Sequence, residues 1–186
     1  MSQPPPTFPE VEEILVTQDQ IAAEIQRLAE RLLSDYEDKD LVLVAVLNGS
    51  VVFLADLIRK LPLRLSFDVI SASSYSGTAS SGAITVEKDL SLDVRGKDVV
   101  LLDDIFDTGL TLSFLMDYLR EQQPRSLKSC VLLYKKKPDR KTAIEPDYWC
   151  LEGADEFVIG YGLDYDSRYR NLPYIASLKK VSHPES

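Results

Sequence analysis

Six residues in the middle of the chain combine carboxylates, hydroxyls and a glycine at a spacing that suits a phosphorylated sugar. They are Asp103, Asp104, Asp107, Thr108, Gly109 and Thr111. An apolar run precedes them and helical spacing follows, which predicts a strand, an acidic loop and a helix start. N–H groups at a helix N-terminus bind phosphate, aided by the threonine hydroxyls, and adjacent carboxylates accept hydrogen bonds from sugar hydroxyls. The predicted ligand is a ribose 5-phosphate.

An ordinary turn is the alternative interpretation of this segment. An isolated Asp-Thr-Gly more often forms a turn whose acidic side chains are solvated. Here three acids follow an apolar strand, and open α/β sheets bind their ligands at the carboxyl ends of strands. We therefore interpret residues 98–111 as a binding site.

The elements that must position this site alternate between helical and strand patterns, which predicts an α/β fold with a mainly parallel sheet covered by helices. The helical spacing of Ile21, Ile25, Leu28 and Leu32 predicts a first amphipathic helix. Residues 75–82 are polar and rich in glycine, so we expect a mobile loop there. The expected strands are 41–47, 64–74, 83–86, 127–134, 157–161 and 174–178, and further helices are expected from about 51 and over 111–122.

Length and composition indicate one domain, over residues 10–186, after a proline-rich tail at residues 1–9. The formal charge of -9 argues against nucleic acid as a partner, since such proteins usually carry a basic face. Cys130 and Cys150 lack the spacing of a metal or redox site. No apolar span or leader is present, so we expect a cytoplasmic protein without a membrane partner.

The acidic segment also resembles the diphosphate-sugar motif of the type I phosphoribosyltransferases, in which two acids precede Asp/Ala/Ser-Thr-Gly-x-Thr. Asp107 resembles the 6-oxopurine branch, since adenine and orotate enzymes typically have Ala or Ser there and pyrimidine-operon regulators an aromatic residue. The resemblance to hypoxanthine-guanine phosphoribosyltransferases covers about residues 40–179. Its other matching segments are Leu47-Asn48-Gly49-Ser50, Ser74-Tyr75, 132–138, and 156–174.

The resemblance implies roles for residues that bind the sugar and its phosphates. Asn48 and Gly49 would hold pyrophosphate through backbone amides, although the family usually has Lys or Arg at position 48. Arg170 would contact pyrophosphate, and Asp164 would coordinate Mg²⁺. Ser74 and Tyr75 resemble the family's catalytic lid, which excludes water. The ribose phosphate would be bound by Asp103, Asp104, Thr108, Gly109, Leu110 and Thr111.

The resemblance also implies roles for residues that bind the purine. The catalytic residue Asp107 would manage the proton at N7. Lys135 would donate to O6, which selects a 6-oxopurine because the amino group of adenine does not accept that hydrogen bond. Phe157 would stack on the base, and the Val158 backbone would read its edge.

Taken together, the resemblance implies a type I phosphoribosyltransferase fold, with a small hood built from the C-terminal segment. The implied activity is purine salvage, in which the phosphoribosyl group of 5-phosphoribosyl diphosphate moves to N9 of hypoxanthine or guanine and pyrophosphate leaves. The implied assembly is a homodimer or homotetramer. The residues do not rank hypoxanthine, guanine and xanthine.

Two alternatives remain open within the same fold. One is a regulatory relative that binds RNA, which the acidic charge and Asp107 oppose. The other is a nucleotide-binding module with weak catalysis, for which Asn48 is the indication.

Overall fold

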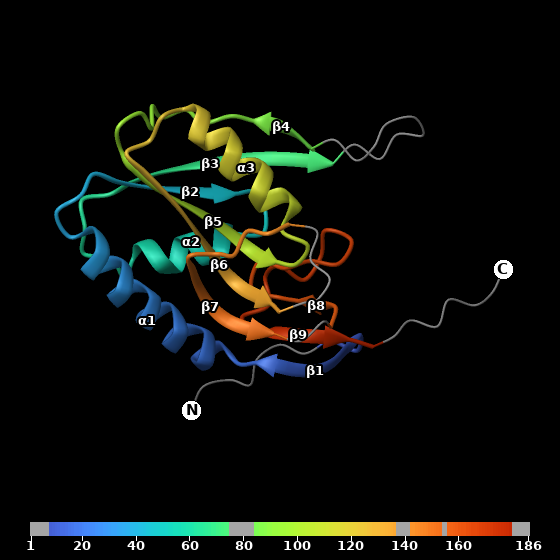
Figure 1. The fold of residues 1–186 in the computed structure, drawn as a ribbon. Helices are drawn as coiled ribbons and strands as arrows, with labels where there is room; N and C mark the ends of the chain where they lie inside the picture. The colour runs from blue at the N-terminus through green and yellow to red at the C-terminus, as the bar shows by residue number, and fades with distance from the viewer. Residues whose placement is uncertain (1–7, 75–83, 137–141, 154–155, 180–186) are drawn as a thin grey trace, which may run out of the picture.

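A mainly parallel six-stranded sheet forms the centre of the protein (Figure 1). The computed structural model describes residues 8–74, 84–136, 142–153 and 156–179. Strand β4 is antiparallel to β3, and the other neighbouring pairs are parallel. This arrangement confirms the predicted fold class. In spatial order the strands are β4 (Ile84–Lys88), β3 (Ser66–Ser74), β2 (Leu41–Val46), β5 (Asp98–Phe106), β6 (Ser126–Lys135) and β7 (Tyr148–Gly153).

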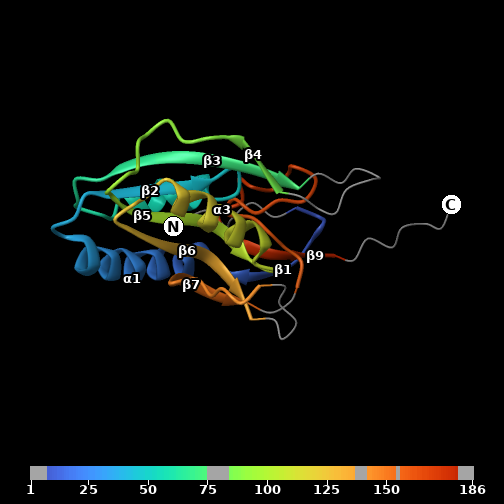
Figure 2. The same ribbon diagram turned by 45° about the horizontal axis from the view of Figure 1, so that its top comes forward.

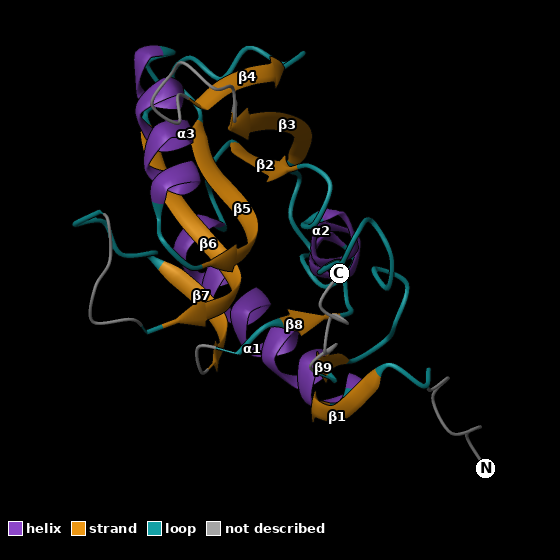
Figure 3. Cartoon of the chain, turned by 90° about the vertical axis from the view of Figure 1, so that its right-hand side faces the viewer, coloured by secondary structure: helices purple, strands orange, loops and turns teal. Residues whose placement is uncertain are grey.

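Helices cover both faces of this sheet. Side chains alternate along β2, so Leu41 and Leu43 pack with helices α1 (Gln18–Tyr36) and α2 (Val51–Ile58), while Val42 and Val44 face α3 (Leu110–Glu121). Figure 2 shows α1 alongside β7, and Figure 3 shows α2 and α3 on opposite sides of β5. Within the described ranges, no helix is long and apolar enough to cross a membrane.

A second, antiparallel sheet lies where the hood is predicted, but it contains an N-terminal strand as well as the C-terminal segment. It pairs β9 (Ile175–Leu178) with β8 (Val158–Ile159) on one side and β1 (Val11–Val16) on the other. The expected strand over 157–161 is therefore too long. The chain turns after Ile159 because Gly160, Tyr161 and Gly162 all have positive φ angles.

Two strands are absent from the sequence prediction. Strand β1 contains two adjacent glutamates, and its partner β9 lies at the other end of the chain, so no local pattern indicates it. Strand β7 is a six-residue edge strand that pairs only with β6 among the described strands. Phe8, which we expect in the tail, packs edge-on against Tyr169, and the Pro9 carbonyl accepts a hydrogen bond from Lys179.

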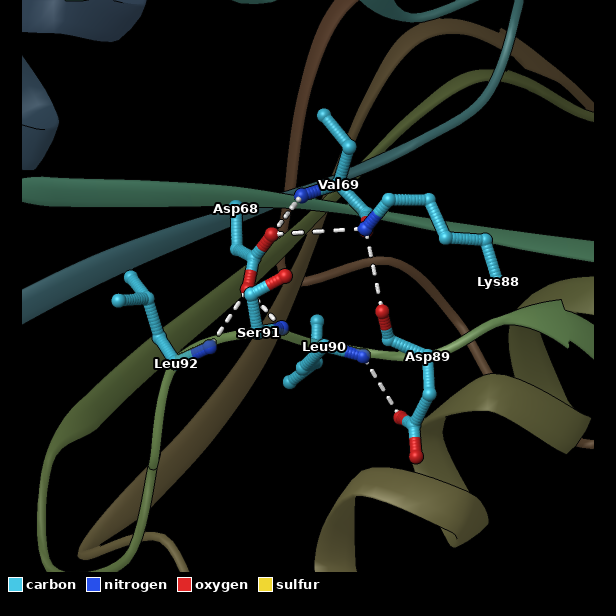
Figure 4. Close-up of polar contacts among 7 residues, drawn as sticks. All are labelled: Asp68, Val69, Lys88, Asp89, Leu90, Ser91 and Leu92. Carbon is cyan, nitrogen blue, oxygen red and sulfur yellow. Dashed lines mark hydrogen bonds and ion pairs between the residues drawn. The ribbon is translucent and has the colours of Figure 1, made fainter.

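A buried carboxylate ties the chain that follows β4 to strand β3 (Figure 4). Asp68 of β3 accepts hydrogen bonds from the backbone N–H groups of Val69, Ser91 and Leu92 at 2.6–2.8 Å. Lys88 lies 3.8 Å from the same carboxylate and donates to the Val69 carbonyl at 2.8 Å. Backbone donors therefore satisfy an acid that is only 8% exposed.

Candidate active site

A cavity of about 300 Å³ lies at the carboxyl ends of β2 and β5. The spatial order of the parallel strands reverses between these two strands, which is where open α/β sheets bind ligands. Three segments that are distant in the sequence converge on it. The predicted site residues in its lining are Asn48, Gly49, Asp103, Asp104, Asp107, Thr108, Gly109, Thr111, Asp164 and Arg170.

The two adjacent acids belong to strand β5, which corrects the expectation that they lie in a loop. The pairing of β5 with β6 continues through Asp103 to Phe106, and only residues 107–109 form the turn before α3. The ladder continues because it needs only backbone groups, whatever the side chains are. Asp103 is therefore buried at 7% exposure, and Asp104 is half-buried.

The proximity of these carboxylates to each other and their burial disfavour two negative charges. Burial raises the pKa of Asp103 well above its usual value, and the Asp104 charge raises it further. Burial also raises the pKa of Asp104, although the nearby Arg170 guanidinium opposes that shift. The site therefore favours a ligand that brings hydrogen-bond donors or a cation to this pair.

Gly49 lets the loop after β2 approach the acids closely. A Cβ atom on this glycine would lie 1.5 Å from Asp104 Oδ2, so no other residue fits without displacing the carboxylate. The peptide bond between Leu47 and Asn48 is cis. Because Gly49 has no side chain, the loop presents its backbone to the cavity directly beside Asp104.

The N-terminus of α3 lies where the sequence predicts a phosphate cradle. Gly109 is the N-cap residue, and α3 begins at Leu110, one residue earlier than expected. The Thr108 hydroxyl accepts a hydrogen bond from the Leu110 N–H at 3.4 Å. Thr108 and Thr111 are exposed and line the cavity, whereas the Leu110 side chain is not among its lining residues. Helix-terminal N–H groups beside two hydroxyls suit a phosphate dianion.

Arg170 and Asp164 form an ion pair at the rim of the cavity. Their closest atoms, Arg170 Nη2 and Asp164 Oδ1, are 2.7 Å apart, and the Ser167 N–H donates to Asp164 Oδ2 at 2.8 Å. Arg170 Nη1 also donates to the Gly162 carbonyl at 2.5 Å. The structure thus brings together two residues that the resemblance assigns to Mg²⁺ and to pyrophosphate.

The carboxylates of this cavity fit Mg²⁺ held with few protein ligands. Asp164, Asp103 and Asp104 supply the hard oxygen atoms that Mg²⁺ prefers, and all three line the same cavity. In the described part of the chain, no group of three or more acidic, histidine or cysteine side chains is arranged to hold a metal by itself. The remaining ligands would come from water and phosphate oxygens, as is usual for Mg²⁺.

Lys135, Phe157 and Val158, which the resemblance assigns to the purine, lie together but outside this lining, whereas Asp107 is part of it. Lys135, at the end of β6, is buried and donates to the Glu156 carbonyl at 2.5 Å, next to Phe157 and Val158. The Phe157 ring is 57% exposed and meets the Tyr165 ring edge-on at 5.6 Å. An exposed ring beside a buried cation provides a surface on which a planar base can stack.

The two predicted lid residues lie at the limit of the described chain. Ser74 is the last residue of β3 and pairs with Ile84 of β4. Tyr75 lies outside the described residues.

The cavity also has an apolar wall that the sequence prediction misses, formed by Ala72, Ile105 and Phe106. Continuing the strand pattern past the acids would have indicated Ile105 and Phe106, because both belong to β5. Ala72 belongs to β3, and no local signal links it to the acidic segment.

Comparisons with known proteins agree with this geometry. Residues 12–166 match the model of the phosphoribosyl transferase domain. The chain is 42% identical to a hypoxanthine-guanine phosphoribosyltransferase of Mycobacterium avium, over 95% of this chain and 91% of that protein. Hypoxanthine phosphoribosyltransferase from Trypanosoma cruzi, in complex with the product IMP, superposes with a TM-score of 0.88 at 36% identity, over 96% of this chain and all of that one. A hypoxanthine-guanine phosphoribosyltransferase from Bacillus anthracis superposes with a TM-score of 0.84 at 39% identity, over 91% of this chain and 99% of that one.

Proposed function

This chain belongs to the phosphoribosyltransferase family, and from that premise we propose that it is a purine-salvage transferase of the hypoxanthine-guanine type. It moves the 5-phosphoribosyl group from 5-phosphoribosyl diphosphate to N9 of hypoxanthine or guanine, giving IMP or GMP and pyrophosphate. One observation carries this proposal beyond family membership. The phosphate cradle, the acidic pair, the Gly49 loop and Arg170 all line one cavity at the reversal of the sheet order.

The sugar and its phosphates occupy the cavity in this proposal. The 5-phosphate binds the N-terminus of α3 and the hydroxyls of Thr108 and Thr111. Asp104 accepts hydrogen bonds from the ribose hydroxyls, with Asp103 assisting. The pyrophosphate lies between the backbone of Gly49 and the guanidinium of Arg170. Asp164 would hold Mg²⁺, whose positive charge would offset the negative charge of the pyrophosphate.

The purine binds beside the cavity, at the end of β6. Lys135 donates to O6, Phe157 stacks on the ring, and the backbone of Val158 reads the edge of the base. Asp107, in the cavity lining, accepts or holds the N7 proton while N9 attacks C1 of the ribose. Ser74 and Tyr75 exclude water, because a water molecule at C1 would hydrolyse the sugar diphosphate instead.

An RNA-binding or catalytically weak relative is less well supported. The chain carries a net charge of -9, and the similar proteins named above are called phosphoribosyltransferases. Asn48 at the cavity is the one observation in favour of weak catalysis, because a lysine or arginine there would bring positive charge to the pyrophosphate. We also propose a cytoplasmic homodimer or homotetramer, whose mass light scattering would measure.

The decisive experiment is a magnesium-dependent assay of pyrophosphate release with hypoxanthine, guanine, xanthine and adenine in parallel. We expect turnover with hypoxanthine or guanine and none with adenine, because Lys135 needs an acceptor at position 6 of the base. Omitting Mg²⁺ should abolish the rate. If a folded protein that still binds a nucleoside monophosphate shows no turnover with any of the four bases, the catalytically weak relative is favoured.

The Asp107→Asn variant separates catalysis from binding in the same assay. We expect a fall of about 100-fold or more in kcat with nucleotide binding retained, since general acid-base groups contribute about that factor. An unchanged kcat would remove Asp107 from the mechanism. A gel shift with transcript leader RNA tests the RNA-binding alternative, and we expect none.

A further inference from the structure

A buried tyrosine outside the cavity links two of the segments that form it. Tyr161 is 5% exposed, and its hydroxyl donates a hydrogen bond to Asp56 Oδ2 in the C-terminal half of α2. Helix α2 directly follows the loop that carries Gly49. Tyr161 and Asp56 are 105 positions apart in the sequence, so the bond joins elements that have no local connection.

The same two segments meet at a second point. Gly162, next to Tyr161, lies so close to the loop that a Cβ atom there would be 2.0 Å from the Gly49 carbonyl oxygen. Its φ angle of +97° also favours glycine. The segment at 160–163 is therefore fixed against the Gly49 loop at one point and against α2 at the other.

Gly162 also holds Arg170. The Gly162 carbonyl accepts from Arg170 Nη1 at 2.5 Å, and its N–H donates to the Arg170 carbonyl at 3.0 Å. A displacement of Gly162 would thus move both the guanidinium and the backbone of Arg170. It would also release the Gly49 loop from its neighbour.

The backbone conformation of Tyr161 requires contacts such as the hydrogen bond to Asp56 to hold it in place. Its φ angle is +50°, a region that side-chain-bearing residues rarely adopt unless surrounding contacts hold them there. Burial and the adjacent Asp56 carboxylate raise the pKa of Tyr161, so its hydroxyl stays protonated and keeps donating at neutral pH. Tyr161 and Asp56 line a second cavity of about 240 Å³, which shares Arg170 with the cavity proposed to bind substrate, and they do not line that first cavity themselves.

We propose that the hydrogen bond from Tyr161 to Asp56 is a positioning contact, which sets Gly162 and through it the Gly49 loop and Arg170 at the pyrophosphate end of the site. This inference rests on the proposed function, since it assigns the contact to one substrate of that reaction. Neither residue touches the reacting atoms. Their effect should therefore fall on 5-phosphoribosyl diphosphate and not on the purine.

The test is the Tyr161→Phe variant, which removes one hydroxyl and keeps the buried ring. We expect the KM for 5-phosphoribosyl diphosphate to rise about fivefold to tenfold, as loss of a hydrogen bond to a charged group allows. The KM for hypoxanthine should stay within about twofold of wild type. Asp56→Ala should reproduce the effect, and the double variant should add little to it, because both changes remove the bond between Tyr161 and Asp56. Asp56→Ala also removes an ion pair with Arg59, whose exposed side chain makes that pair a small contribution.

Asp56→Asn supplies the rescue, because its amide oxygen still accepts from the tyrosine hydroxyl. Tyr148→Phe is the matched control. Tyr148 is also a buried tyrosine that donates to an aspartate, Asp35 of α1, but it starts the edge strand β7, which β6 separates from β5, and it does not line the cavity. Its loss should lower the thermal midpoint without changing either KM.

The outcomes separate this inference from the proposed function. A wild-type protein without turnover contradicts the proposed function. An active wild type whose Tyr161→Phe variant loses thermal stability but keeps both KM values overturns only the positioning role. If Tyr161→Phe does not fold, the comparison of Asp56→Ala with Asp56→Asn tests the positioning role instead. A raised KM for 5-phosphoribosyl diphosphate in Asp56→Ala but not in Asp56→Asn supports the role, and equal values contradict it.

Discussion

At the scale of single residues, the Asp103 carboxylate lowers the stability of the ligand-free fold, and its proposed role in binding explains why it is present. The carboxyl group is buried and lies beside Asp104, so burial and the neighbouring charge raise its pKa. A group whose pKa is raised on folding is stabilising in its protonated form and costs stability once it ionises. Active sites often contain such groups, because the ligand and not the fold supplies the missing partner.

Asp103→Asn should therefore make the ligand-free protein more stable and less active. We expect the free energy of unfolding at pH 7 to rise by roughly 1 kcal/mol, because the amide keeps the shape without the charge. Turnover should fall, since an acceptor of the ribose hydroxyls is weakened. Urea denaturation measures the first quantity and pyrophosphate release the second. Asp38→Asn, at an exposed position of the surface, is the control. If Asp103→Asn is less stable than the wild type, the inferred destabilisation by the Asp103 charge is wrong.

At the scale of elements, β3 and the chain that follows β4 depend on one carboxylate (Figure 4). Burial alone would raise the pKa of Asp68, but the N–H groups of Leu92, Val69 and Ser91, with Lys88, outweigh it and lower that pKa. One side chain thus satisfies three backbone donors, namely Val69 within β3 and Ser91 and Leu92 in the connection between β4 and β5. An acid with this many donors is a structural centre and not a ligand site.

Asp68→Asn should cost about 2 kcal/mol of unfolding free energy, because the amide accepts from fewer of these N–H groups and loses the charge. The comparison is Asp89→Asn in the same turn. Asp89 is exposed and accepts from the Leu90 N–H at 2.7 Å, so its loss should cost under about 1 kcal/mol. Chemical denaturation of both variants gives the two values. Equal losses of unfolding free energy in the two variants would show that Asp68 stabilises this region no more than Asp89 does.

At the scale of the whole molecule, the pH dependence of stability combines two groups of carboxylates with opposite effects. The hydrogen bond from Arg125 is the main cause that lowers the pKa of Asp98, and backbone donors lower that of Asp68. These acids contribute stability above the unfolded pKa of about 3.9, and that stability is lost as the pH falls through their folded values. Asp103 does the reverse, because its pKa is raised and its contribution disappears as the pH rises.

Two variants should therefore converge on the wild type from opposite sides as the pH is lowered. At pH 7 Asp103→Asn should melt above the wild type and Asp68→Asn below it. The Asp103→Asn difference should shrink first, while the pH is still above about 4, because the raised pKa of Asp103 lets its carboxyl gain a proton there. The Asp68→Asn difference should shrink only below about pH 4, as the pH falls towards the lowered pKa of Asp68. Thermal melts from pH 7 to pH 3 without ligand measure this. If the differences in melting temperature between the variants and the wild type stay constant with pH, the change in side-chain shape and not the loss of charge causes both of them.

The sequence by itself determined the parts of this protein that depend on neighbouring residues. The helical spacing of Ile21, Ile25, Leu28 and Leu32, the apolar runs of β2 and β6, and the cradle at Thr108 and Gly109 all follow from local periodicity and turn chemistry. These preferences act over a few residues, so they can be seen in the chain before it folds.

Only the tertiary structure decided which distant residues meet. Strand β1 became visible through its pairing with β9, and the acids at 103 and 104 were placed in β5 by its ladder with β6. Likewise, no sequence pattern indicates that Gly162 lies against Gly49 or that Tyr161 reaches Asp56. Such contacts depend on how the sheets and helices pack, which is a property of the whole chain and not of any short segment.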